Sequence, residues 1–483
     1  MTGWPNAAFV ILALPAATAA LLSALPSYRL SAALNVASAF VTFLASISLF
    51  AAAPAPNAYI LVDDLNVVFI VLNTFVGFTA SVFSATYIAH EIETGRLTPT
   101  HLRFYHAMYQ FLLFSMNLAL IANNIGLMWV AIELATLTTV LMVGVYRTPE
   151  AIEAAWKYFI LGSVGIALAL FGTILVYMAA RPVVGEGVQG MLWTSLIRSV
   201  ADFDPSLLDL AFVFLLLGYG TKVGLAPLHA WLPDAHAEGP TPISAVLSGL
   251  LLNVALYAVL RFKLLLDANA RALAPGPLMA TLGLISIVFA AFMLYRRRDV
   301  KRLFAYSSIE HMGVIVFAFG IGGPLANFAA LLHMAMHSLT KSAIFYTVGQ
   351  IAQVKGSQQI ADIRGLTVSN PLLGWSLVFG VFAIVGMPPM GVFMSEFLIV
   401  SSTFERAPWL ALLLAFGLLV ALGALVLRMQ GMAFGTPTGS TAAAAAKSSS
   451  LPILAHFALV LMAGVYLPPP LVTWFQHVAE LLR

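Results

Sequence analysis

The chain has 483 residues, of which 61% are hydrophobic and only 9% are charged. This composition excludes a soluble globular protein, and because the apolar character runs along the whole length, it also excludes a soluble domain with one membrane anchor. The chain has no cysteine, which excludes disulfides, a thiolate nucleophile and a cysteine-ligated iron–sulfur cluster on this chain. We therefore predict a multi-span membrane protein with no redox centre, no cofactor and no nucleic-acid partner.

Apolar runs separated by polar residues, proline or glycine predict about fourteen membrane-spanning helices and hence an all-α fold. They lie near residues 6–25, 29–53, 65–88, 104–122, 124–145, 156–179, 207–238, 242–262, 276–295, 303–320, 325–351, 372–402, 408–432 and 451–467. The residues before the first run, MTGWP, lack a basic region, so we expect no cleavable signal peptide. Residues 183–205 are too polar to span and should lie at the surface, and residues 433–450 should form a mobile polar linker.

Basic residues are distributed unevenly between the predicted loops. The loops after odd-numbered spans carry more lysine and arginine than the loops after even-numbered spans. They include one cluster, whose side chains we expect to be solvated: Arg296, Arg297, Arg298, Lys301 and Arg302. The positive-inside rule places this cluster in the cytoplasm and both chain termini outside.

Two of the predicted spans are interrupted by proline. The seventh span is broken at Pro227, and the twelfth, five spans later, is broken at Met387, Pro388 and Pro389. Paired broken helices in corresponding positions indicate inverted repeats with a site near the middle of the membrane. We therefore divide the chain into helices 1–3 (residues 1–103), a first repeat (104–262), a second repeat (276–432), and the linker with the last helix (433–483).

Several predicted spans carry ionisable side chains at membrane depth. A charge at the centre of the bilayer costs at least about 2.5–3.5 kcal/mol, so such residues are candidates for a functional site. The eleventh span places three of them four residues apart, on one helical face. The whole predicted proton pathway, in which acidic and basic groups can shift one another's protonation, consists of Glu133, Lys222, His333, His337, Lys341 and Glu396.

Two pairs in this row have structural alternatives. Glu133 and Lys222, taken alone, could simply clamp two packed helices together. His333 and His337 have the spacing of a metal-binding pair. No third ligand accompanies them, however, and Lys341 on the same face would repel a cation. We therefore predict no metal site.

Five further ionisable residues lie near the row. His229 and His236 flank the first break and could either cap a helix end or join the proton pathway. Glu310 and His311 lie in the tenth span, and Lys157 lies near the start of the sixth. Of these, Lys157, His229, His236 and Glu310 are possible members of the pathway.

Four long motifs carry a resemblance to a known family. They are GTKVGLAPLHAWLPDAHAEGPTPISAVLSG, DVKRLFAYSSIEHMG, LLHMAMHSLTKSAIFYTVG and GMPPMGVFMSEFLI. Through them, residues 60–430 resemble the antiporter-like membrane subunits shared by respiratory complex I, Mrp-type sodium/proton antiporters and membrane-bound hydrogenases. The resemblance implies fourteen helices with two inverted five-helix repeats. The variants SSIEHMG and LLNVALYAVLRF are most similar to the hydrogenase-4 component F type.

The resemblance also implies roles for individual residues. The family's charged axis matches Glu133, Lys222, His337 (with His333 before it), Lys341 and Glu396. One position departs from the family pattern, because Asn253 stands where a bridging lysine or histidine is common. Asn253 is therefore a further possible member of the pathway. Asparagine cannot carry a proton at ordinary pH, however, so the pathway there would need water or another group such as Glu310.

The implied function is that of a proton-translocating subunit in a bacterial inner-membrane oxidoreductase complex. Its expected partners are other membrane-arm subunits, the lipid bilayer, and a peripheral hydrogenase or dehydrogenase arm with iron–sulfur clusters. A subunit of a complex I-type NADH:quinone oxidoreductase, a stand-alone sodium/proton antiporter and an idle membrane scaffold remain alternatives. The coupling ion and the electron donor stay open.

Overall fold

The computed structural model describes residues 6–437 and 448–482, without the side chains of residues 99–103. Most of these residues are helical, and the described part of the chain contains no β-strand. The prediction of an all-α polytopic membrane protein is therefore confirmed. The core of the predicted linker, residues 438–447, lies outside the described residues.

The helices follow one another in this order. The first third holds α1 (Ala7–Ala24), α2 (Tyr28–Ile47), α3 (Asp64–Glu93), α4 (Pro99–Ile121), α5 (Ile125–Val143) and α6 (Pro149–Val184). Next come α7 (Trp193–Ser199), α8 (Pro205–Val223), α9 (Trp231–Glu238), α10 (Thr241–Val246), α11 (Leu252–Asp267), α12 (Gly276–Leu294) and α13 (Val300–Ile321). The rest holds α14 (Pro324–Lys355), α15 (Leu366–Ser369), α16 (Pro371–Ile384), α17 (Gly391–Arg406), α18 (Pro408–Phe434), α19 (Leu451–Val465) and α20 (Pro469–Leu481). Short helical turns are η1 (Ser48–Phe50), η2 (Gly144–Tyr146), η3 (Gly187–Met191), η4 (Val200–Asp202) and the π-helical η5 (Leu247–Leu251).

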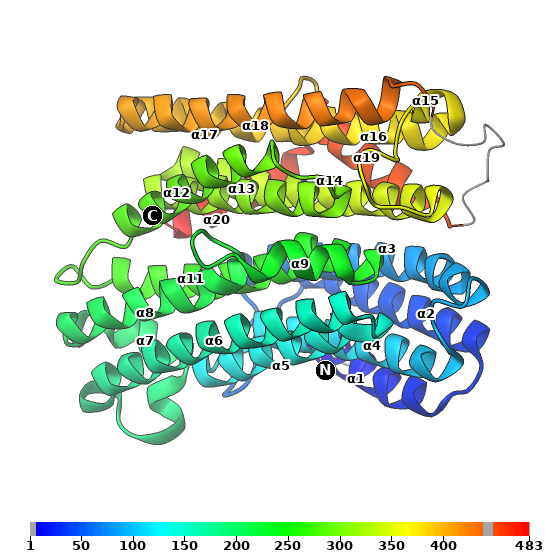
Figure 1. Ribbon diagram of the computed structural model, residues 1–483. Helices are drawn as coiled ribbons and strands as arrows, with labels where there is room; N and C mark the ends of the chain where they lie inside the picture. The colour runs from blue at the N-terminus through cyan, green and yellow to red at the C-terminus, as the bar shows by residue number, and fades with distance from the viewer. Residues whose placement is uncertain (1–5, 438–447, 483) are drawn as a thin grey trace.

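The long helices lie side by side and roughly parallel, from α1 at one edge to α18 at the other (Figure 1). Eleven helices among the described residues are long and apolar enough to cross a membrane, and the bent pair α19 and α20 could add a twelfth. The predicted spans 325–351 and 372–402 correspond to α14, which is too polar for this criterion, and to the separate helices α16 and α17. The total of fourteen spans, the repeat boundaries and the orientation of the termini stay predictions.

Both predicted breaks are observed, and they share one backbone pattern. Gly224 follows α8 with a φ of 84°, and a cis peptide bond precedes Pro227. Gly386 lies between α16 and α17 with a φ of 67°, and a cis peptide bond precedes Pro389. Glycine adopts this left-handed conformation without the steric penalty of other residues. Both breaks thus place a left-handed glycine shortly before a proline.

Two segments form the interior of the bundle. Helix α14 packs against α10, α13, α16, α17, α19 and α20. The most apolar stretch of the segment Thr241–Asp267, which joins α10, η5 and α11, is entirely buried. Because neighbouring helices enclose both segments, their polar side chains are surrounded by protein rather than by lipid.

The last helix, α20, is an element that the sequence did not predict. It bends away from α19 by 78° and packs against α3 and α14. Lys263 donates a hydrogen bond to the Leu482 carbonyl (3.0 Å), Asn327 donates to the same carbonyl (3.0 Å), and Trp474 donates to the Asp64 carbonyl (3.1 Å). These contacts attach the end of the chain to α3, α11 and α14.

Candidate functional site

Lys222 and Glu133 form the first part of the buried row. Lys222 lies in the last turn of α8, directly before the break, and its side chain is 2% exposed. Its ammonium lies 3.7 Å from the Glu133 carboxylate on α5 and donates a hydrogen bond to the Thr136 hydroxyl at 2.7 Å. Glu133 is 19% exposed, so this carboxylate reaches the surface of the chain while its partner does not. The predicted pairing of the two residues is observed.

The Lys222 ammonium is enclosed from the side by α6. An added Cβ atom at Gly162 of α6 would lie 2.9 Å from the Lys222 Nζ atom, and the Tyr158 ring centre lies 5.8 Å from it. Tyr158 in turn stacks on Trp231, whose indole donates a hydrogen bond to the Thr221 carbonyl across the break. The sequence thus uses a small residue to admit the lysine head group and aromatic rings to fix the broken helix beside it.

Histidines from two helices meet in the second part of the row. The Nδ1 atom of His311 on α13 lies 2.9 Å from the Nε2 atom of His333 on α14. The ring centres of His311 and His337 are 5.5 Å apart, and the Glu396 Oε1 atom on α17 lies 4.0 Å from the His311 Nδ1 atom. All three histidines are buried, and the side chain of Glu396 is 13% exposed. The structure therefore brings the predicted residues together around His311.

Lys341 and Glu310 complete this part. Lys341 is fully buried, and its ammonium donates a hydrogen bond to the Phe304 carbonyl at 2.9 Å. Glu310 is close enough to Lys341 to interact with it electrostatically, and its Oε2 atom lies 3.9 Å from the His311 Nε2 atom. That carboxylate oxygen has no hydrogen-bond partner among the described residues. Glu310, predicted as a possible member, thus lies within the row.

His236 lies near the second part of the row. Its ring stacks on Phe345 of α14 at 5.0 Å, and it interacts electrostatically with Lys341 and His337. Neither ring nitrogen has a hydrogen-bond partner among the described residues, and the residue is fully buried. Asn253 instead donates hydrogen bonds to the Ser338 hydroxyl at 2.7 Å and to the Gly249 carbonyl at 3.0 Å. Asn253 therefore links α11 to α14, whereas His236 has free nitrogens near the row.

Two other predicted candidates lie apart from the row. Lys157 is 47% exposed and pairs with Glu153 at 2.6 Å and with Asp234 at 3.2 Å. His229 is 7% exposed, and its ring packs 4.7 Å from the ring of Phe289.

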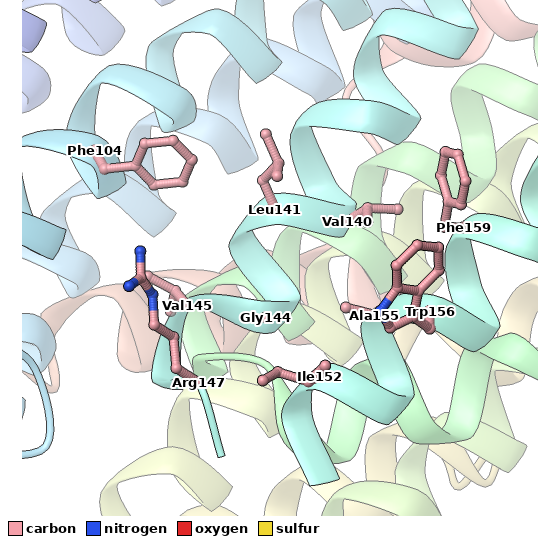
Figure 2. A pocket seen from close by; sticks show the side chains of 10 residues that line it. All are labelled: Phe104, Val140, Leu141, Gly144, Val145, Arg147, Ile152, Ala155, Trp156 and Phe159. Atoms are coloured by element: carbon pink, nitrogen blue, oxygen red, sulfur yellow. The ribbon is translucent and has the colours of Figure 1, made fainter. Parts of the chain in front are cut away.

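A groove formed by α4, α5 and α6 also lies away from the row. Apolar side chains, among them Leu141 and Trp156, line it, and Arg147 is the only charged residue among the described side chains of its lining (Figure 2).

Sequence reasoning missed two features of this region. His311 is the centre of the second part, although the sequence placed it only in the tenth span. Lys301 was expected to be solvated with the arginine cluster, and that expectation is wrong, because the residue is 1% exposed. Its ammonium donates hydrogen bonds to the carbonyls of Ala237 (2.9 Å) and Gly239 (2.7 Å), at the C-terminal end of α9. A helix C-terminus favours a cation, and this explains the burial.

Comparisons with known proteins agree with this architecture. The family model described as NADH:quinone oxidoreductase/Mrp antiporter, TM matches residues 122–423. The chain is 64% identical over 463 residues to the protein named hydrogenase-4 component F homolog of Methylacidiphilum infernorum, covering 96% of this chain and 97% of that protein. It is 33% identical over 273 residues to NADH-quinone oxidoreductase subunit M of Escherichia coli (strain K12), covering 56% and 52% of the two chains.

Two solved structures establish the fold. One is a chain of the membrane-bound sulfane sulfur reductase, an archaeal respiratory membrane complex, with a TM-score of 0.86, 23% identity and coverage of 99% and 98%. The other is a chain of the Mrp complex from Dietzia sp., with a TM-score of 0.84, 16% identity and coverage of 99% and 97%. Together with the sequence matches, these findings confirm the predicted resemblance: the chain belongs to the family of antiporter-like membrane subunits of NADH:quinone oxidoreductases and Mrp antiporters.

Proposed function

We propose that this chain is the proton-translocating membrane subunit of a hydrogenase-4-type energy-converting complex. The observation that carries the proposal is the buried row itself, which contains carboxylates, lysines and imidazoles from Glu133 to Glu396 within a largely apolar bundle. Isolated buried charges are costly, so a row of them indicates a path for ions. The extensive identity to a component F homolog supports the choice of complex.

The geometry supports a transfer of protons from one pair to the next. While Glu133 lies beside Lys222, the carboxylate stabilises the protonated ammonium. A movement of Glu133 away from Lys222, driven by redox chemistry in a partner subunit, would remove that stabilisation and release the proton into the row. Glu396, at the partly exposed end, would then pass a proton out.

Proton transfer from the first part of the row to the second cannot use the residue at position 253. Asn253 cannot accept and release a proton, and its amide is engaged by Ser338 and Gly249. His236 has two unpartnered nitrogens and interacts electrostatically with Lys341 and His337. We therefore assign the crossing to His236 together with water, and Glu310 to the path beyond it.

The proposal includes partners and a location. Other membrane-arm subunits would cover the outer face near Glu133, which is partly exposed on the isolated chain. The redox step would take place in a peripheral arm with iron–sulfur clusters, because this chain has no cysteine to ligate one. The complex would lie in a bacterial inner membrane, with both termini of this chain outside.

Proton uptake by proteoliposomes that contain the purified complex tests the role of the row. We expect Lys222→Met to reduce redox-driven proton translocation by about a hundredfold or more, the scale of a lost proton-transfer group. Lys157→Met is the matched control, because Lys157 lies in exposed ion pairs, and it should retain translocation. Unimpaired translocation by Lys222→Met would refute the proposed pathway.

Mild-detergent purification of the tagged chain, followed by mass spectrometry of the proteins that accompany it, tests the choice of complex. Nickel–iron hydrogenase subunits are the expected partners. NADH dehydrogenase subunits would reassign the chain to a complex I-type enzyme. Recovery with small antiporter subunits only would favour a sodium/proton antiporter.

A further inference from the structure

Three helices bring two imidazoles and one carboxylate to a common centre. His311 of α13, His333 of α14 and Glu396 of α17 each offer one ligand atom, and these atoms all lie within 4.8 Å of one another. The His311 Nδ1 atom lies 2.9 Å from the His333 Nε2 atom and 4.0 Å from the Glu396 Oε1 atom. We propose that these three residues form a binding site for one zinc-class divalent metal ion.

The set of donors fits such an ion. Two histidines and one glutamate are a known ligand set for zinc, with a fourth position left for water. Ligand atoms about 2.0–2.1 Å from a tetrahedral zinc ion stand roughly 3.3 Å from one another. The two histidine nitrogens, 2.9 Å apart, would therefore separate by about 0.4 Å, and the Glu396 Oε1 atom, 4.0 Å from the His311 Nδ1 atom, would approach that atom by about 0.7 Å.

The surroundings orient the ligands. The Ser395 hydroxyl donates its proton to the Val392 carbonyl (2.8 Å), so it accepts a hydrogen bond from the His333 Nδ1 atom (2.9 Å). That arrangement places the proton of His333 on Nδ1, so its Nε2 atom accepts a hydrogen bond from the His311 Nδ1 atom (2.9 Å) in the metal-free chain. Both nitrogens become available to a metal once the proton of His311 moves to its Nε2 atom.

Glu310 supplies a second, independent indication. Its side chain is 2% exposed, and its Oε2 atom has no hydrogen-bond partner among the described residues. The same oxygen lies 3.9 Å from the far nitrogen of His311. A carboxylate behind a ligating histidine is the usual outer partner of such a ligand, because it accepts the proton of the nitrogen that does not bind the metal. Metal binding to His311 through Nδ1 would give Glu310 that role.

The site differs from the metal pair that the sequence suggested and then disfavoured. That pair combined His333 with His337, whereas the structure supplies the missing ligands from other helices, namely His311 and Glu396. Glu396 also gives access, because it is the one ligand of the three with appreciable exposure, at 13%. If the proposed function is correct, a bound ion would occupy nitrogens that pass the proton and would stop transfer in the second part of the row.

Zinc uptake by the purified full-length chain tests the site. The chain is incubated with zinc chloride and freed of unbound metal, and retained zinc is measured by mass spectrometry and X-ray absorption. We expect one zinc ion per chain with nitrogen and oxygen ligands only, since the chain has no cysteine. His333→Gln and Glu396→Gln should abolish retention, and Glu310→Gln should weaken affinity by about 10–100-fold.

His106→Gln is the matched control, because His106 is a fully buried histidine of α4, outside the cluster. It should retain one zinc ion. Each variant is compared with the wild type by thermal unfolding, and Glu396→Asp provides a folded alternative if Glu396→Gln aggregates. Absence of retained zinc in the wild type, or equal retention by His333→Gln, would overturn the site.

The effect on transport separates this inference from the proposed function. Zinc that binds with the expected ligands and inhibits proton translocation supports both. Zinc that binds with the expected ligands but leaves translocation unchanged supports the metal site and contradicts a proton path through His311 and His333.

Discussion

The position of the Glu396 carboxylate depends on a single glycine across the second break. Gly386 has a φ of 67°, and the Glu396 Oε2 atom occupies the space that a Cβ atom at position 386 would need. Two separate constraints therefore act on this residue: its backbone conformation and its contact with a carboxylate. The chain provides a second glycine that has only the first constraint. Gly356, which ends α14, has the same φ of 67° and no atom within 4 Å of an added Cβ.

This pair allows the two constraints to be separated. Gly386→Ala and Gly356→Ala should each lose about 1–2 kcal/mol of unfolding free energy, the cost of a left-handed conformation for alanine. Only Gly386→Ala should also displace Glu396, and it should therefore lose most proton translocation. Thermal unfolding in detergent and proton uptake by proteoliposomes measure the two effects. Equal translocation by the two variants would show that the contact with Glu396 has no role.

Among the helices, α9 is short, and two basic residues contact its C-terminal end. It spans only Trp231–Glu238, too few residues to be stable alone, yet it carries His236. Lys301 is buried and donates two hydrogen bonds to carbonyls at this end, while the neighbouring Arg302 is 39% exposed and pairs with Asp234 and Glu238. Adjacent basic residues thus bind the same helix, one from inside and one from the surface.

Substitution of Lys301 and of Arg302, one at a time, should show how much each residue contributes to the unfolding free energy. Lys301→Met leaves two carbonyls without their donor, and a buried polar group without a partner costs about 1–3 kcal/mol, so the total loss should be about 2–6 kcal/mol. Arg302→Met removes surface ion pairs worth about 1 kcal/mol or less. Thermal unfolding and hydrogen exchange of the α9 amides measure both losses. A larger loss for Arg302→Met than for Lys301→Met would contradict this account.

At the scale of the whole molecule, the C-terminal helix joins parts that are distant in the sequence. Helix α20 packs against α3 and α14, and Asn327 and Lys263 both donate to the Leu482 carbonyl. These contacts connect the N-terminal helices with both predicted repeats, so the last residues stabilise the arrangement of the helices rather than one helix.

A chain that ends after Leu467 should therefore unfold at a lower temperature while keeping most of its helix content. It leaves Lys263 and Asn327 with fewer partners, and it uncovers apolar surface of α3 and α14. Trp474→Phe is the matched control, since it removes the hydrogen bond to the Asp64 carbonyl while keeping an aromatic ring beside Phe50, and it should cost about 1 kcal/mol. Circular dichroism on heating checks both variants. An unchanged midpoint for the truncated chain would disprove the anchoring role.

The sequence predicted the spans and both breaks because their signals are local. An apolar run of about 20 residues identifies a span, and a proline identifies a break, without knowledge of the neighbours. Helix α20 lacks such a signal, because its 13 residues are too few to span and are amphipathic. The burial of Lys301 also lacks a local signal. In the sequence it belongs to a basic cluster typical of a cytoplasmic loop, and only the folded chain brings the end of α9 next to it.

The sequence predicted which residues belong to the candidate site, but it did not predict which of their side chains contact one another. Glu133, Lys222 and Lys341 stand out as charges within apolar runs. The central place of His311 was not predictable, because almost every residue of α13 is buried and the sequence pattern therefore shows no preferred face. Which side chains meet across α13, α14 and α17 depends on how these helices pack.

The spacing of the three imidazoles has a consequence for how many charges the region can store. The ring centres of His311 and His333 are 5.1 Å apart, and those of His311 and His337 are 5.5 Å apart. Two positive charges at such distances repel by about 3 kcal/mol at an effective dielectric constant near 20, which makes double occupancy roughly a hundredfold rarer. The three histidines together would therefore hold one excess proton. On the proposed pathway, a second proton would therefore arrive only after the first had left, and protons would cross this region one at a time.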